Sequence, residues 1–390
     1  MPRSGRAATL IATLLLLPAC SSNDNIRVIQ SSGPVYSVDS RGTQTVKPVA
    51  LAAGRGPLVL ESGGSYVDAA TDLTVAYAGP KPVLCLIDTA ADGKGDPYDR
   101  FDSYAGVEML TLNITPETSN SPKVIEALDR CSGYYFNAGN PELLSKGLLL
   151  GHDDSKALAV IRRHHDTRGA AISGISAGAT IAGPVTLCEC SSKSSIAALT
   201  KGVLYQAPAY RFVDNVIIDT HFFANGLIGR NLYALAKTGE AASVGIDDGA
   251  AVIVPGDGGL WRVIGSSSVA FIQRGPAATT SRLQGFTISL LNAGDSFNPL
   301  SGHVAIAKTR KQQTLASDPA AGPMQMGGIF EPDSLRQLIV DFAQAPNMSA
   351  QGYAEGEGLV IELRKRSDTV IFSDDAGVSV LNLDIAVARF

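Results

Sequence analysis

The sequence lacks the features that mark several large classes of protein. Among its 390 residues are only five histidines and five cysteines, and the net charge is -5. No apolar run is long enough to span a bilayer comfortably, which argues against a membrane-spanning helix. With no basic stripe there is no reason to expect nucleic-acid binding. Because no Cys or His pairs stand at zinc spacing, we expect no metal site, and no cofactor is indicated.

The composition that remains is that of a globular protein. The chain is 45% hydrophobic and 18% charged, which is typical of a folded protein and not of a disordered one. Its length exceeds the size at which a single hydrophobic core usually stops growing. One large domain with an appendage is therefore expected.

The N-terminus has the pattern of an export signal, with Arg3 and Arg6 ahead of a short apolar run over residues 7–17. Leu-Pro-Ala-Cys, ending at Cys20, then resembles a bacterial lipoprotein signal in which Cys20 is lipidated. Ser21 follows, as in signals that lead to the outer membrane. We expect an exported protein that is lipid-anchored to the cell envelope, with ordinary secretion as the alternative.

Four cysteines remain if Cys20 is lipidated. Cys85 lies in an apolar, strand-like segment, where a cysteine usually belongs to the core. The others are Cys131, Cys188 and Cys190, of which the last two are separated by one residue and could bond to each other only with strain. An exported compartment permits a disulfide, but the sequence does not show which pair would form it.

From residue 56 onward, short apolar segments alternate with helical patterns. Strands are expected at residues 57–64, 82–88, 107–114, 134–136 and 170–174, and helices at 67–78, 121–131 and 155–166. Near-continuous apolar strands separated by helices favour a parallel sheet that is covered on both faces. The sequence thus predicts a doubly wound, mostly parallel α/β fold with its site at the carboxyl ends of the strands.

After residue 256 the pattern changes to short strands between turns. Strands are expected at residues 260–263, 269–273, 286–291, 304–308, 359–363, 369–372 and 378–387, with a linker at 311–328 and a helix at 332–343. The predicted organisation has four parts: a signal peptide (1–20), a tether and N-terminal extension (21–55), a main α/β domain (56–310) and a small C-terminal α+β extension (311–390).

One strand end has the pattern of a nucleophile elbow. The apolar segment at 170–174 leads into Gly174-Ile175-Ser176-Ala177-Gly178, in which flanking glycines permit the sharp strand-to-helix turn that exposes a serine. The free N–H groups of the following helix could hold an oxyanion. A glycine-rich loop with a buried serine is the alternative, since this motif alone is weak.

A serine nucleophile needs a histidine base, and His221 has the best position because it ends the apolar strand Val216–Thr220. His164 and His165 lie in a basic helical run and are expected on a solvated face. His303 stands among the late strands and would suit an esterase of the α/β-hydrolase type, in which the histidine comes last.

The acid that would orient His221 is less clearly marked. Asp247 and Asp248 end another short apolar strand, and we favour Asp248, although an Asp-Gly pair is also a strong turn signal. Glu189 and Asp219 are competitors.

Taken together, these motifs resemble the S51 serine peptidases, the family of cyanophycinase and dipeptidase E. The resemblance covers roughly residues 56 to 310. It is carried by Gly174–Ala179, Asp219–Phe222, Gly245–Asp248, Phe136–Pro141 and the early pair Gly63-Gly64. It implies a class I glutamine amidotransferase-like α/β sandwich that hydrolyses an amide bond in a peptide or isopeptide substrate.

The resemblance also assigns roles to residues. It implies Ser176 as nucleophile, His221 as base and Asp248 where cyanophycinases carry a glutamate, with backbone N–H groups near Gly139 and Ala177 as the oxyanion hole. Substrate contacts would come from four residues at the matched positions: Asn140, Asp219, Thr220 and Arg230.

Several matched positions depart from the family pattern. Thr220 replaces a glutamine, and Pro141 stands where a glutamine usually ends the oxyanion loop. Of three arginines that grip substrate carboxylates, only Arg230 remains, because Asn225 and Leu227 occupy the other two positions. A neutral side chain cannot replace bidentate carboxylate binding, so altered specificity is expected. Arg230 could still bind one carboxylate or simply pair on a helix. A cell-surface binding lipoprotein that kept the fold without the chemistry is the alternative function.

Overall fold

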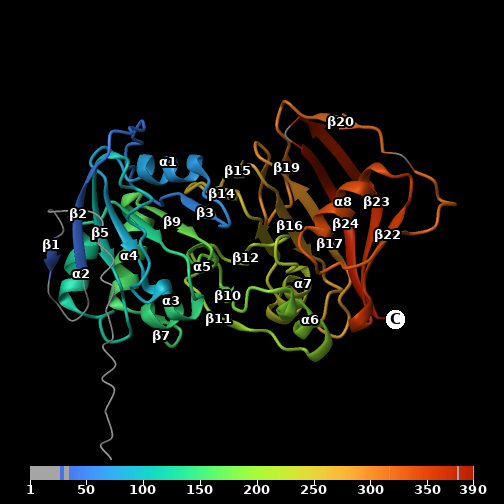
Figure 1. Ribbon diagram of the computed structural model, residues 1–390, viewed down its shortest axis with the longest axis horizontal. Coiled ribbons are helices and arrows are strands. Elements are labelled where there is room, and N and C mark those ends of the chain that lie inside the picture. Colours follow the sequence, from blue (N-terminus) through green and yellow to red (C-terminus); the bar gives the residue numbers. More distant parts are fainter. Residues whose placement is uncertain (1–26, 30–34, 316, 376, 390) are drawn as a thin grey trace, which may run out of the picture.

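The computed structural model describes residues 27–29, 35–315, 317–375 and 377–389. The predicted signal peptide, with its lipidation site Cys20, lies outside these residues. Two large sheets organise the described chain and lie side by side in Figure 1. We call them the first sheet and the second sheet.

The first sheet has eleven strands, of which the central five are parallel. In sheet order the strands are β1 (Arg27–Ile29), β2 (Val35–Arg41), β5 (Ala105–Leu112), β4 (Val83–Ile87), β6 (Gly133–Phe136), β9 (Ala171–Ile175), β3 (Leu58–Glu61), β14 (Ala250–Val254), β15 (Trp261–Gly265), β18 (Ser296–Phe297) and β19 (Val304–Ala305). The parallel strands β5, β4, β6, β9 and β3 correspond to the five that the apolar segments predict.

Helices cover both faces of the first sheet. They are α1 (Asp68–Tyr77) on one face, and α2 (Pro122–Asp129), α3 (Pro141–Leu148) and α4 (Lys156–Arg168) on the other. Alternate residues of β4 show the two faces: Leu84 and Leu86 pack in a cluster with Val75 of α1. Cys85 and Ile87 pack with the opposite helices. The predicted α/β fold, with a parallel set of strands covered on both faces, is therefore confirmed, while the first sheet as a whole is mixed because antiparallel strands flank that set.

The second sheet has nine strands, most of them antiparallel. They are β12 (Val216–Thr220), β13 (Ala242–Ile246), β16 (Val269–Arg274), β17 (Phe286–Leu291), β24 (Gly377–Arg389), β23 (Leu359–Asp374), β22 (Ser349–Ala354) and β21 (Met324–Met326), with β20 (Lys311–Gln313) beside β23. Three helices pack in its core, namely α6 (Ser192–Lys201), α7 (Ile228–Thr238) and α8 (Ser334–Gln344).

The second sheet runs across the boundary expected at residue 310. Strand β17 pairs directly with β24, and residues from both sides of the boundary share one hydrophobic cluster. Residues 311–390 thus complete a sheet that residues 216–291 begin. The expected linker at 311–328 contains β20 and β21, while the expected helix at 332–343 corresponds to α8.

Short elements complete the description. They are the ribbons β7 (Leu149–Leu150) with β8 (Asp153–Asp154) and β10 (Val185–Leu187) with β11 (Gln206–Pro208), the one-turn helix α5 (Ala177–Thr180), and the 3-10 turns η1 (Thr89–Ala91) and η2 (Glu355–Glu357).

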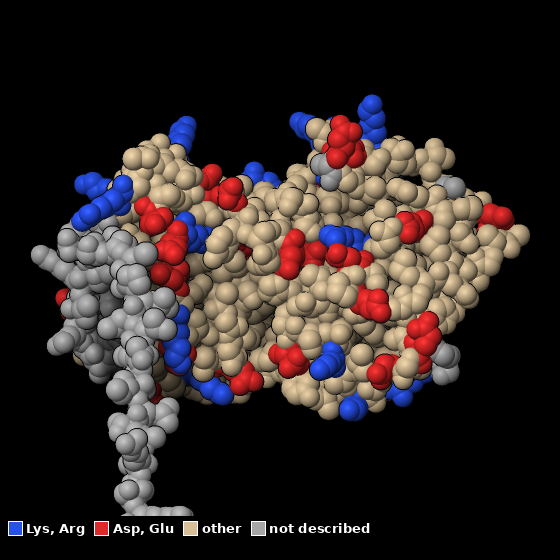
Figure 2. Space-filling view, viewed as in Figure 1, with Lys and Arg blue, Asp and Glu red and all other residues tan. Residues whose placement is uncertain are grey.

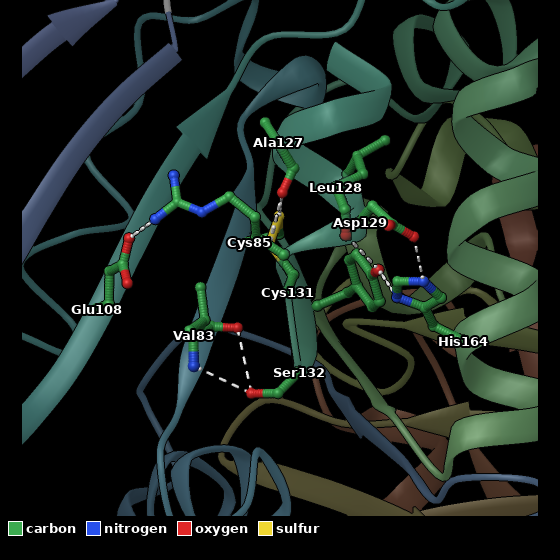
Figure 3. The surroundings of a disulfide bond; sticks show 11 residues. Val83, Cys85, Glu108, Ala127, Leu128, Asp129, Cys131, Ser132 and His164 are labelled. Atoms are coloured by element: carbon green, nitrogen blue, oxygen red, sulfur yellow. Dashed lines mark hydrogen bonds and ion pairs between the residues drawn. A yellow bond between two sulfur atoms is a disulfide. The ribbon is translucent and has the colours of Figure 1, made fainter. Parts of the chain in front are cut away.

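A disulfide joins Cys85 to Cys131, with the two Cα atoms 5.8 Å apart. Figure 3 shows it between β4 and the end of α2, next to the hydrogen bond between Asp129 and the buried His164 ring. Cys85 is fully buried, as the apolar strand predicts. Cys188 and Cys190 are free.

The expectation that His164 and His165 lie on a solvated face is wrong, because both side chains are fully buried. His164 bonds Tyr134 Oη at 2.7 Å and Asp129 at 3.0 Å. His165 Nδ1 lies 3.1 Å from the Ala170 carbonyl oxygen. The helical run carries its charge on Arg162 and Arg163, while the histidines turn towards the sheet.

His165 should make the stability of the fold depend on pH. Burial lowers the pKa of His165 to about 4, so the unfolded chain binds more protons than the folded one between that pH and about 6.5. Stability from the neutral ring is therefore present above pH 6.5 and is lost as the pH falls to 4, by about 3 kcal/mol. We expect the free energy of unfolding measured in urea to show this pH dependence. In His165→Gln it should depend less on pH. The exposed His152→Gln should behave as wild type, and equal pH slopes in all three proteins would contradict the prediction.

The surface seen in Figure 2 carries acidic and basic side chains interspersed among many uncharged ones. Across the ranges given above, none of the helices is both long and apolar enough to cross a membrane. The same residues contain no group of three or more His, Cys, Asp or Glu placed to hold a metal ion.

Candidate active site

Ser176 stands at a sharp turn between β9 and α5. Its backbone has φ 52° and ψ -119°, a conformation that non-glycine residues rarely adopt and that persists only where the surroundings enforce it. A Cβ at Gly174 would collide with the Gly178 carbonyl, and one at Gly178 with the Phe136 carbonyl. The Gly-x-Ser-x-Gly motif therefore forms the strand-to-helix elbow that the sequence predicts.

His221 lies directly against this serine. Its Nε2 atom is 3.0 Å from Ser176 Oγ, within hydrogen-bond distance. The residue follows β12, whose carboxyl end meets the end of β9, although the two strands belong to different sheets. Its backbone N–H donates to Ser62 Oγ at 2.7 Å, which ties the histidine to the end of β3.

Asp248 contacts the other ring nitrogen of His221. The distance from Asp248 Oδ1 to His221 Nδ1 is 2.5 Å. Asp248 lies in the turn by which the chain leaves β13 of the second sheet and enters β14 of the first. The three side chains thus form a continuous chain from nucleophile to base to acid, at the junction of the two sheets.

The glycines at the end of β3 leave room for this arrangement. A Cβ at Gly63 would lie 2.8 Å from His221 Cε1, and one at Gly64 would collide with the Asp248 carboxylate. Ser62, just before them, lies 3.3 Å from Asp248 Oδ1 and was not among the residues expected at the site. Its position beside Gly63-Gly64 was the signal that could have indicated it.

The competing acids have other partners. Asp247 is buried and accepts backbone N–H groups from Phe223 and Ala224, each at 2.9 Å. Burial raises the pKa of the Asp247 carboxyl, against the hydrogen bond from Ala224 and the charge of Arg336, which lower it. Glu189 is exposed and accepts a hydrogen bond from Ser191 at 2.7 Å. His303 precedes β19, the far edge strand of the first sheet.

A pocket of about 380 Å³ opens beside Ser176. Its lining includes both residues expected at the oxyanion hole, Gly139 and Ala177. Ala177 begins α5, where backbone N–H groups lack intrahelical partners. Gly139 has φ 140°, and a Cβ there would collide with the Ala90 carbonyl, so this loop position requires glycine.

The residues expected to bind substrate divide into two groups. Asn140 and Thr220 line the pocket, although the Asn140 side chain also caps α3 by accepting the Glu142 N–H at 2.9 Å. Arg230 also lines the pocket, but it is buried against Asp219, with contacts of 2.9 and 2.5 Å.

The contacts of Arg230 favour the pairing role over carboxylate binding. An arginine has five N–H donors. Those of Arg230 meet Asp219, the carbonyl oxygens of Cys188 and Glu189, and the Cys190 sulfur. The guanidinium lines the pocket and holds the loop at 188–190, and four of its five donors already have oxygen partners. Asp219, fully buried in the same cluster, is likewise a structural residue.

Comparison with known proteins gives distant relatives of one kind. The chain is 26% identical over 236 residues to cyanophycinase of Synechococcus elongatus, which covers 56% of this chain and 70% of the relative. It is 24% identical over 245 residues to cyanophycinase of Geminocystis herdmanii, covering 58% of this chain and 88% of the relative. These matches confirm the resemblance to the S51 peptidases at low identity.

Among solved structures, a peptidase from an acI-B1 actinobacterium aligns with a TM-score of 0.48 and 19% identity, covering 63% of this chain and 98% of the other. None of the known family models matches the chain.

Proposed function

We propose that this chain, a divergent relative of the S51 peptidases, is an exported serine-type peptidase or isopeptidase. The observation that carries the proposal is the hydrogen-bonded series Ser176–His221–Asp248, with distances of 3.0 and 2.5 Å. A nucleophile bonded to a base, which is itself oriented by an acid, is the arrangement that acyl transfer requires.

The reaction would proceed in two halves, acylation of Ser176 and then hydrolysis of the acyl-serine, with His221 moving a proton in each. Ser176 Oγ attacks the amide carbonyl carbon while its proton passes to His221 Nε2. N–H groups at Gly139 and Ala177 stabilise the oxyanion. The C–N bond then breaks as His221 returns the proton to the leaving amine, which leaves an acyl-serine. Water attacks this ester with His221 again as base, so the acid product leaves and Ser176 is restored.

The pocket supports a substrate other than the carboxylate-bearing one that the three arginines of the family pattern would grip. Of the described residues that line it, only Arg230 is basic, and Asp219 neutralises it. Glu142 and Glu189 also line the pocket. Because Lys146 pairs with Glu142 at 3.2 Å, Glu189 is the acidic side chain that a carboxylate next to the scissile bond would meet, and we expect neutral or basic substrate side chains.

Export with a lipid anchor at Cys20 remains part of the proposal. The Cys85–Cys131 disulfide supports it, because such bonds persist in oxidising compartments outside the cytoplasm.

Covalent labelling tests the proposal directly. A fluorophosphonate probe should label the purified protein at Ser176, and Ser176→Ala should abolish labelling. The matched control Ser281→Ala, an exposed serine outside the pocket, should label as wild type does. Absence of labelling in the folded wild-type protein would refute the proposal and favour the binding lipoprotein.

A further inference from the structure

The backbone at His221 is in a conformation that needs support. His221 has φ 56°, in the left-handed region that non-glycine residues avoid. It begins a short loop over residues 221–227, which we call the histidine loop, between β12 and α7. Such a conformation persists only where the surrounding structure enforces it.

Asp247 supplies one part of that support from inside the molecule. Its Oδ1 atom accepts the N–H groups of Phe223 and Ala224, both at 2.9 Å. Asp247 is buried and directly precedes Asp248, so it connects the histidine loop with the acid of the site. Its second oxygen, Oδ2, points to a different pair of partners.

Those partners are Ser267 and Arg336. Ser267 Oγ donates to Asp247 Oδ2 at 3.0 Å, and Arg336 Nη1 lies 3.2 Å from the same oxygen. Arg336 belongs to α8, in the C-terminal extension. Its Nη2 atom pairs with Asp333 at 2.7 Å, which fixes the guanidinium between the two carboxylates.

The backbone next to α8 also contacts the histidine loop. The Asp333 N–H donates to the Phe223 carbonyl at 2.9 Å. Gly226 comes so close to Phe330 that a Cβ would collide with its carbonyl. Phe222 and Phe223 pack in one hydrophobic cluster with Leu335 and other residues of α8.

From these contacts we infer that the C-terminal extension holds the histidine loop in its catalytic geometry, and that Arg336 is the positioning residue through which it acts on Asp247. This gives residues 311–390 a role in the site as well as in the second sheet. Only the kinetic readout below rests on the proposed function.

The test compares Arg336→Ala and Arg336→Lys with Arg366→Ala. Arg366 is the matched control, because it forms ion pairs with Asp368 and Asp384 on β23 and β24 and has no contact with Asp247. Labelling by a fluorophosphonate probe gives a maximal rate at saturation and an apparent affinity separately. Arg336→Ala should lower the maximal rate about tenfold at unchanged affinity, since small displacements of catalytic groups cost rate. Arg336→Lys and Arg366→Ala should stay within about twofold.

Repeating the test in an Asp247→Asn variant shows whether the loss of rate in Arg336→Ala depends on Asp247. Asp247→Asn keeps an oxygen for the two loop N–H groups but removes the charge that Arg336 contacts. In this background Arg336→Ala should slow labelling no further. An equal, additional loss would overturn the inference, as would a loss of the same size in Arg366→Ala.

A measurement that does not depend on the reaction of Ser176 separates this inference from the proposed function. The ring signal of His221 in a histidine NMR spectrum, assigned by its absence in His221→Gln, should move in Arg336→Ala and not in Arg366→Ala. If the wild type fails to label and the signal still moves, the proposed function fails and the inference stands. If the wild type labels and neither rate nor signal responds to Arg336→Ala, the inference is wrong.

Discussion

Asp248→Asn should lower kcat by about 10⁴-fold while KM changes little. The carboxylate now lies 2.5 Å from His221 Nδ1, where it accepts the ring proton. An amide at this position can instead present its NH₂ group, which favours the tautomer with the proton on Nε2. Nε2 then cannot take the proton of Ser176, whose oxygen lies 3.0 Å away. The measurement is steady-state kinetics on a peptide or isopeptide found in a substrate screen, with the fluorophosphonate labelling rate as a parallel readout.

Two matched variants make this prediction specific to one carboxylate. Glu189→Gln should leave kcat within about twofold, because Glu189 bonds Ser191 while Asp248 bonds His221, and any effect of this pocket-lining residue should fall on KM. Asp247→Asn should cause a loss of about tenfold, through the loop that it holds. If Glu189→Gln lost as much activity as Asp248→Asn, the acid would be assigned to the wrong residue.

The local part of this site could be read from the sequence because local rules determine it. Glycines around Ser176 are required by a turn between adjacent elements, and the apolar strands ahead of His221 and Asp248 place both residues at strand ends. The five central strands of the first sheet follow from uniform apolar runs in the same way.

What could not be predicted depends on contacts between distant residues. Nothing near Arg230 in the sequence shows that the carbonyl oxygens of Cys188 and Glu189 accept hydrogen bonds from its guanidinium. His164 and His165 were misplaced because the pattern of charged neighbours does not show which side chains turn inward.

The place of the C-terminal extension in the second sheet could not be predicted either. Strand β17 at 286–291 has an apolar pattern that suits either a sheet edge or a sheet interior, and only its pairing with β24 decides between them. The contact between Arg336 and Asp247 spans 89 residues. Such pairings depend on how whole sheets pack together. The pattern of a single segment carries no information about that packing.

The second large effect is on stability. Replacing both Cys85 and Cys131 by alanine should lower the free energy of unfolding by about 4 kcal/mol, the loop entropy expected for a 46-residue separation. Chemical denaturation with and without reductant measures it. Wild type in reductant should approach the double variant, whose own stability should not respond to reductant. Cys188→Ala, a buried free cysteine, is the control for lost packing alone.

This loss should leave the labelling rate of Ser176 nearly unchanged at temperatures where the protein stays folded. Cys131 precedes β6 and Cys85 lies in the middle of β4, whereas Ser176 and Gly139 follow the carboxyl ends of β9 and β6, so the bond does not reach the end of the sheet where the site lies. A stable double variant would contradict the prediction. A large stability loss at constant labelling rate would mean that the fold depends on oxidising conditions while the chemistry does not, which agrees with the proposed export.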